Sequence, residues 1–155
     1  MVKIEKVTAE DIETVRSLFL EYASSLNFDL CFQNFSEELK NLPGDYSPPS
    51  GSLLLANYEG EPAGCIALRR IDDRTCEMKR LYVKDIFRGK NIGKLLVDKI
   101  ILEAKIIGYD KMRLDTTSTM RSAQKLYRSA GFYEIDPYYP NPLEGVLYME
   151  LKLAV

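Results

Sequence analysis

A basic, glycine-bearing segment at Arg88–Gly93 (RGKNIG) has the residue types for binding a charged ligand. It follows a strand-like apolar run and precedes a long stretch with helical spacing of apolar residues. A helix N-terminus exposes unpaired amide N–H groups and a partial positive charge, so it attracts phosphate. Gly89 and Gly93 in this segment let the backbone come close to a ligand, and Asn91 tolerates a left-handed conformation. The residues predicted to hold a diphosphate are Arg88, Gly89, Lys90, Asn91, Ile92, Gly93 and Lys94.

Two common phosphate motifs do not fit this segment. A Walker loop has four residues between its glycines and then Gly-Lys-Ser/Thr. Here three residues separate Gly89 from Gly93, and Leu95 stands where the magnesium-binding hydroxyl would be. The glycine spacing of the dinucleotide fingerprint is also missing. A basic helix start without any ligand is the alternative that spacing alone leaves open.

The surrounding pattern predicts a single α/β domain over residues 1–155 with a mixed sheet, because hairpins and helical crossovers alternate. Two proline-rich loops, at 41–51 and 136–145, are too short to separate domains. Helices are expected at 8–26, from Ser36 to Lys40, at 92–107 and at 120–130. Strands are expected at 2–7, 53–56, 63–68, 76–83, 112–116, 132–135 and 146–153.

The composition excludes several function classes. With 21 basic and 23 acidic residues, the net charge is -2, so nothing drives the whole chain toward nucleic acid or anionic lipid. No apolar run approaches the ~18 residues of a membrane span. The chain has no histidine, which removes histidine triads and most catalytic zinc sites, and no metal is expected. The three cysteines, Cys31, Cys65 and Cys76, are odd in number and form no C-x-x-C pair, which favours reduced thiols and a cytoplasmic protein.

From Glu77 to Phe132 the chain resembles the GNAT superfamily of N-acetyltransferases. Its cofactor motif, Gln/Arg-x-x-Gly-x-Gly/Ala, is matched by Arg88–Gly93, with Asn91 in place of the middle glycine. A second element, AQKLYRSAGF at 123–132, is similar to the family's A-x-x-L-Y-x-x-x-G-F. One departure is Met120, where many members have an asparagine that bonds the cofactor.

The resemblance implies an α/β fold with a splayed mixed sheet that admits acetyl-CoA between two parting strands, here 76–83 and 112–116. Backbone groups of Leu81, Tyr82 and Val83 would face the pantetheine arm. The implied reaction is direct transfer of an acetyl group from acetyl-CoA to the primary amine of a small molecule or a protein. A non-catalytic acyl-CoA sensor is the alternative, and a homodimer is a further expectation.

Two residues are predicted to carry protons in that reaction. Glu77 is the expected base, because several family members use a glutamate on this strand and the chain has no histidine. Its alternative is a solvent-facing residue paired with Lys79 or Arg69. Tyr127 is the expected acid toward the leaving thiolate, since a phenol with a pKa near 10 can donate its proton to a thiolate. The alternative interpretation is that Tyr127 is a core tyrosine.

Acceptor recognition has weaker signals. Lys79-Arg80 and Arg69-Arg70 fit solvated strand faces, or else a basic wall that guides an acidic substrate. The aromatic segment at 138–142 (YYPNP) lies where the last loop would overhang the acceptor site.

Overall fold

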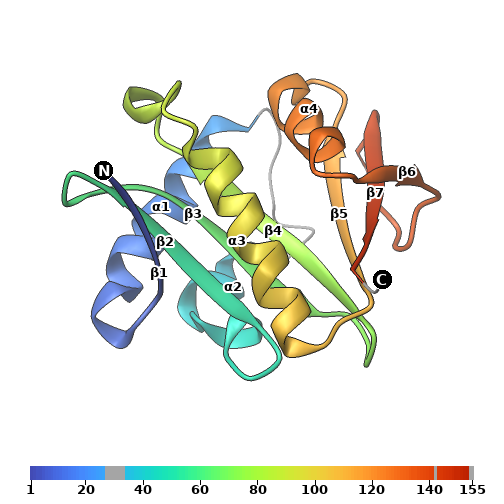
Figure 1. Ribbon diagram of the computed structural model, residues 1–155, viewed down its shortest axis with the longest axis horizontal. Helices are drawn as coiled ribbons and strands as arrows, with labels where there is room; N and C mark the ends of the chain where they lie inside the picture. Colours follow the sequence, from blue (N-terminus) through green and yellow to red (C-terminus); the bar gives the residue numbers. More distant parts are fainter. Residues whose placement is uncertain (27–33, 142, 154–155) are drawn as a thin grey trace.

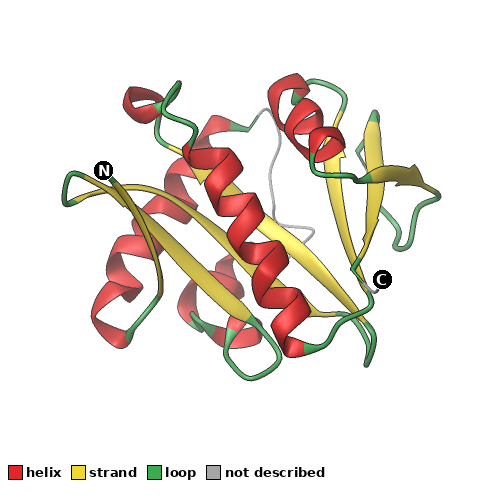
Figure 2. Cartoon of the chain, in the orientation of Figure 1, coloured by secondary structure: helices red, strands yellow, loops and turns green. Residues whose placement is uncertain are grey.

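The computed structural model describes residues 1–26, 34–141 and 143–153, so Cys31 lies outside the described residues. Four α-helices and seven strands were found in this part of the chain (Figure 1, Figure 2). The helices are α1 (Ile12–Ser25), α2 (Phe35–Lys40), α3 (Ile92–Ile107) and α4 (Arg121–Ser129), with short 3-10 turns at η1 (Ala9–Asp11), η3 (Gly44–Tyr46) and η4 (Asp85–Phe87). The strands are β1 (Val2–Lys6), β2 (Ser52–Tyr58), β3 (Glu61–Arg70), β4 (Thr75–Val83), β5 (Lys111–Thr117), β6 (Tyr133–Ile135) and β7 (Val146–Lys152).

The strands form one mixed sheet in the order β1-β2-β3-β4-β5-β7-β6. Every neighbouring pair is antiparallel except β4 and β5, which run parallel. That parallel pairing covers only three positions and ends at Glu77 opposite Arg113. Beyond these residues the two strands part (Figure 1). The predicted α/β fold and its splayed mixed sheet are therefore confirmed.

Helices cover both faces of the sheet, and each face has its own apolar core. The helices α3 and α4 lie over one face, where Leu96, Ile100 and Tyr127 join buried strand residues. On the opposite face, α1 supplies Val15, Leu18 and Phe19 to a second core. Helix α3 presents one apolar face at helical spacing, which explains why it packs along the sheet. None of the helices among the described residues is long and apolar enough to cross a membrane.

A bulge in β4 bends this strand just beyond the point where the sheet opens. Arg80 has a φ of 61°, in the left-handed region, and the register between β3 and β4 shifts between Cys65 and Ala67. A bulge re-aims the backbone groups around it and often lies beside a functional site. The guanidinium of Arg80 is buried and forms two 2.8 Å hydrogen bonds with the carboxylate of Glu38 on α2. The helix α2 therefore holds the bulge from the second face of the sheet.

Candidate functional site

A groove of about 760 Å³ runs from the parted edge of β4 to the N-terminus of α3 and across to α4. Its lining comes from three places. These are β4 with the turn after it, the start of α4, including Met120 and Arg121, and the end of α1 from Tyr22 to Leu26. Eight of the ten residues predicted to bind the cofactor line this groove: Leu81, Tyr82, Val83, Arg88, Gly89, Asn91, Ile92 and Gly93.

The turn before α3 presents its amides as the sequence predicts. Gly89 has a φ of 82° and Asn91 a φ of 66°, so both adopt the left-handed conformation. The first hydrogen bond of the helix runs from Leu95 N–H to the Asn91 carbonyl at 3.2 Å, and no side chain caps this end. The amides of Ile92, Gly93 and Lys94 therefore precede the helical ladder. They form a site with the geometry and polarity that a phosphate needs.

The two lysines of this segment have partners away from the groove. The Lys90 ammonium lies 4.8 Å from the centre of the Tyr58 ring, and the Lys94 ammonium lies 2.7 Å from Asp98. Neither lysine is among the residues lining the groove. Arg88 does line it, although its guanidinium also lies 3.0 Å from Asp85. The electrostatic pull on a ligand here comes mainly from the helix terminus and Arg88.

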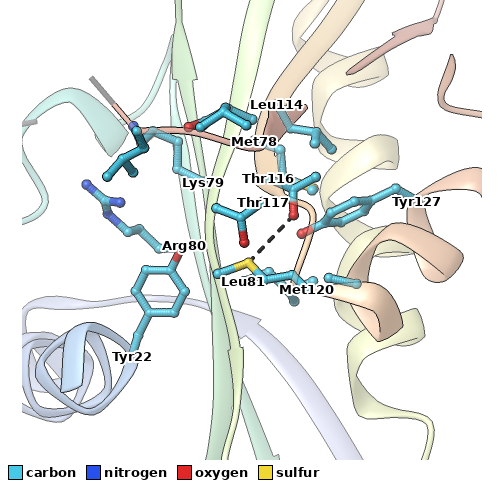
Figure 3. A pocket seen from close by; sticks show the side chains of 14 residues that line it. Tyr22, Met78, Lys79, Arg80, Leu81, Leu114, Thr116, Thr117, Met120 and Tyr127 are labelled. Carbon is cyan, nitrogen blue, oxygen red and sulfur yellow. Dashed lines mark hydrogen bonds between the residues drawn. The ribbon is translucent and has the colours of Figure 1, made fainter. Parts of the chain in front are cut away.

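A smaller cavity of about 70 Å³ lies between the parted strands β4 and β5 (Figure 3). It shares four lining residues with the groove, so the two spaces adjoin: these are Tyr22, Leu81, Met120 and Ala123. Thr116 donates a 3.6 Å hydrogen bond to the Met120 sulfur across this cavity. Among the described residues, no group of three or more potential metal ligands was found.

Tyr127 comes from α4 and its hydroxyl points into this cavity (Figure 3). The side chain is buried, and its ring packs against Phe132 with 5.9 Å between centroids. The hydroxyl has no hydrogen-bond partner among the described residues. Every fully buried polar side-chain atom of those residues does have a partner, so the Tyr127 oxygen is not fully buried. The oxygen is therefore open to the cavity. Burial raises the pKa of Tyr127 above its ordinary value, and the neighbouring Tyr22 and Asp115 add to this. The phenol thus keeps its proton until a stronger base accepts it.

Glu77 lies on β4, before the bulge, and is fully buried rather than solvent-facing. One carboxylate oxygen accepts a 2.7 Å hydrogen bond from Arg69, and the other accepts a 2.6 Å bond from the Tyr138 hydroxyl. Burial by itself would raise the pKa of Glu77, but the charges of Lys79 and Arg69 and the bond from Tyr138 hold it below its ordinary value. Glu77 lines neither the groove nor the cavity. Its contact toward the cavity is Lys79, whose ammonium lies 3.9 Å away.

The expectation that Lys79 and Arg80 lie on a solvated strand face is wrong. Both side chains are buried and line the cavity, because the bulge turns this part of β4 inward beneath α1 and α2. Arg80 is paired with Glu38 and stacks on Phe35, with its guanidinium 5.2 Å from the ring centre. Burial lowers the pKa of Lys79, and the nearby Glu77 carboxylate opposes that shift.

The sequence pattern does not predict several of the lining residues. Asp115 on β5 lines the cavity and accepts a 2.6 Å hydrogen bond from the Tyr139 hydroxyl. In the sequence, Asp115 is an acidic residue between Leu114 and Thr116 of an alternating strand, which is an ordinary pattern. Tyr22 on α1 lines both spaces, but it lies in an ordinary amphipathic pattern. The residues from Thr119 to Ser122 enter the groove because α4 begins there.

Comparison with known proteins connects this geometry to an enzyme family. Residues 12–132 match the Acetyltransferase (GNAT) family, which is most of the chain. The chain is 42% identical over 147 residues to an uncharacterised N-acetyltransferase of Schizosaccharomyces pombe, covering 94% of this chain and 90% of the relative. It is also 35% identical over 117 residues to the N-acetylaspartate synthetase of Danio rerio, covering 74% of this chain but 42% of that protein.

Solved structures show the same fold. A GNAT-family acetyltransferase from Staphylococcus aureus aligns with a TM-score of 0.80 and 26% identity, covering 99% of both chains. The PaiA N-acetyltransferase of Thermoplasma acidophilum, solved in complex with coenzyme A, aligns with a TM-score of 0.77 and 23% identity. That alignment covers 98% of this chain and 99% of the other.

Proposed function

The chain belongs to the acetyltransferase (GNAT) family, and we propose that it transfers an acetyl group from acetyl-CoA to the primary amine of a small amino acid-like acceptor. One observation carries this proposal. The groove at the N-terminus of α3 adjoins the cavity into which the Tyr127 hydroxyl points, and four residues line both spaces. A long anionic co-substrate is therefore able to lie along the groove with its reactive end in the cavity.

The groove residues bind and orient acetyl-CoA in this account. The amides from Gly89 to Gly93 hold the diphosphate, and backbone groups of Leu81, Tyr82 and Val83 hold the pantetheine arm. Acetyl-CoA is a co-substrate here, and the account includes no metal. With the thioester fixed between β4 and β5, the acceptor nitrogen and the carbonyl carbon meet without a costly search for orientation.

Two side chains manage the protons. Glu77 takes one proton from the acceptor ammonium through intervening water, on a path that passes Lys79. The neutral nitrogen then forms a bond to the carbonyl carbon, and the carbon–sulfur bond breaks as the intermediate collapses. Tyr127 donates its proton to the departing sulfur and regains one as the new amide loses its second hydrogen. In each turnover, one ammonium and one thioester give one amide, one free thiol and one released proton.

The charges that line the cavity and the names of two relatives both indicate the class of acceptor. The cavity lining contains two cationic side chains, Lys79 and Arg80, and one carboxylate, Asp115. Such a lining suits an acceptor that carries a carboxylate as well as its amine. The relatives named N-acetylaspartate synthetase, from Danio rerio and Homo sapiens, act on an acceptor of this kind. We therefore place small amino carboxylates ahead of protein amines.

The test is acetyl-CoA-dependent release of free thiol with four amines: L-aspartate, L-glutamate, β-alanine and spermidine. We expect the amino carboxylates to be turned over and spermidine to be poor. Glu77→Gln should lower kcat by about 100-fold, the lower end of what a positioned proton acceptor contributes. Full turnover by Glu77→Gln would remove Glu77 from the mechanism. Tight CoA binding without acetylation of any amine, including protein lysines, would instead favour a non-catalytic sensor.

Location and assembly are part of the proposal. We propose a cytoplasmic enzyme, supported by Cys65 and Cys76, which are free and buried thiols on neighbouring strands. A homodimer is proposed as well, and sedimentation analysis of the purified chain would decide between one copy and two.

A further inference from the structure

Asp115 occupies a distinctive position in the opening between β4 and β5. The paired part of these strands ends at Glu77 opposite Arg113. Asp115 lies two residues farther along β5, which places its side chain on the same face as Arg113 and about 7 Å nearer the open end. Asp115 is the one carboxylate among the described residues that line the 70 Å³ cavity. Asp115 therefore lines the same cavity as Tyr127 and the bulge residue Arg80, whereas Glu77 does not line it.

The Asp115 carboxylate is held in one orientation by the loop between β6 and β7. The Tyr139 hydroxyl donates a 2.6 Å hydrogen bond to Asp115 Oδ2, and Asn141 donates a 3.0 Å bond to the Tyr139 oxygen. The Tyr139 ring packs at 5.5 Å from the ring of Tyr148, the residue paired with Asp115 across β5 and β7. Asp115 Oδ1 accepts no hydrogen bond from the described residues, so one oxygen remains for another donor.

A primary ammonium is the natural partner for such an oxygen. It carries a full positive charge and three donors, and a charge-assisted hydrogen bond to a carboxylate is about twice as strong as a neutral one. The hydroxyls of Thr116 and Thr117 lie in the same cavity lining and supply further acceptors. Asp115 also influences the other titratable groups there, since its charge raises the pKa of Tyr127 and opposes the burial-induced fall in that of Lys79.

We propose that Asp115 is the residue that binds the ammonium group of the acceptor and positions its nitrogen beside the thioester, with Tyr139 orienting the carboxylate. This inference rests on the proposed amine acetylation and names the acceptor-binding group within it. Asp115 and Glu77 then have different tasks: Asp115 selects and holds the charged acceptor, and Glu77 receives the proton that must leave before attack.

The test uses Asp115→Asn, which keeps an oxygen to accept the Tyr139 bond but removes the charge. With the most active amine of the four-compound panel, we expect its KM to rise about 30-fold or more, the lower end of the cost of removing one partner of a buried charge pair. The KM for acetyl-CoA should stay within about twofold, because the groove residues are unchanged. Asp73→Asn is the matched control, since Asp73 lies on an exposed turn beside Arg70. Asp115→Glu should recover part of the lost affinity for the amine.

A binding measurement separates the ammonium from the rest of the acceptor. In the presence of CoA, the amine-free analogue of an amino carboxylate acceptor (succinate for L-aspartate) should bind wild type and Asp115→Asn with similar affinity. An unchanged KM for the amine in Asp115→Asn would overturn the proposal. So would a fall in kcat with loss of the acid limb of the pH–rate profile, which would make Asp115 the proton acceptor. If the wild-type chain acetylates no amine, the proposed function fails before Asp115 is tested.

Discussion

The two sides of the opening between β4 and β5 are built in different ways. The proposed cofactor side uses one continuous segment, Arg88–Gly93, with backbone amides at the start of α3. The acceptor side uses side chains from β4, from β5 and from the loop that carries Tyr138 and Tyr139. A site made of backbone in one segment depends on local sequence, whereas a site made of dispersed side chains depends on tertiary packing. The predictions below separate these two kinds of construction.

The largest effect is expected where α2 holds the bulge between the two sides. Glu38→Gln removes the carboxylate charge that pairs with the buried Arg80 guanidinium, which should cost about 3–5 kcal/mol in the free energy of unfolding. Glu37→Gln is the matched control on the same helix, because Glu37 is exposed and forms a surface ion pair with Lys40 at 3.7 Å. That control should change stability by less than about 0.5 kcal/mol. Urea denaturation of both variants gives the comparison, and equal losses would show that the pair does not hold the bulge.

Removal of the proposed proton donor on α4 should have the next largest effect. Tyr127→Phe removes a hydroxyl that has no hydrogen-bond partner among the described residues, so stability should change little. Turnover should fall by about 100-fold if the phenol protonates the leaving thiolate. The control is Tyr109→Phe. The Tyr109 hydroxyl donates a hydrogen bond to the Ser50 carbonyl and does not line the cavity. Steady-state kinetics with saturating acetyl-CoA measures this, and undiminished kcat would make Tyr127 a core residue.

The sequence predicted the backbone geometry of the Arg88–Gly93 turn well and the surroundings of the cavity side chains poorly, for a physical reason. The left-handed Asn91 and the free amides after it follow from residue types at fixed spacing, so they were expected and were found. The inward turn of Lys79 and Arg80 depends on a bulge, and Arg80 is buried only because Glu38 arrives from α2. Asp115 is ordinary in the sequence and becomes distinctive only when β4 and β5 part beside it.

A charge placed at the start of α3 should act on the cofactor side alone. A side chain at Gly93 would meet Leu126 at 3.5 Å and Val83 at 3.9 Å, which is ordinary contact within the groove wall. Gly93→Asp and Gly93→Asn add nearly the same bulk, but only the aspartate repels a diphosphate. We expect the KM for acetyl-CoA to be about tenfold higher in Gly93→Asp than in Gly93→Asn. The gap should narrow as salt is added, because screening weakens exposed charges. Equal values for the two variants would place the diphosphate elsewhere.

The smallest effect concerns acid stability on the acceptor side. The pKa of Glu77 is held below its ordinary value of 4.5 in the folded chain. Its charge therefore stabilises the fold above that pH, and this contribution is lost as the pH falls through the lower folded pKa. The free energy of unfolding of the wild-type chain should exceed that of Glu77→Gln by about 1 kcal/mol at neutral pH. The difference should stay constant down to the ordinary value and shrink below it. A difference that grew on acidification would contradict this assignment.

The central claim is that one continuous path joins the helix terminus of α3 to the cavity at Tyr127. A crystal structure of the chain with CoA tests it most directly. We predict density for the diphosphate against the amides from Gly89 to Gly93, with the sulfur between β4 and β5 beside the Tyr127 hydroxyl. CoA bound with its diphosphate away from that turn, or with its sulfur outside the opening of the two strands, would contradict the account.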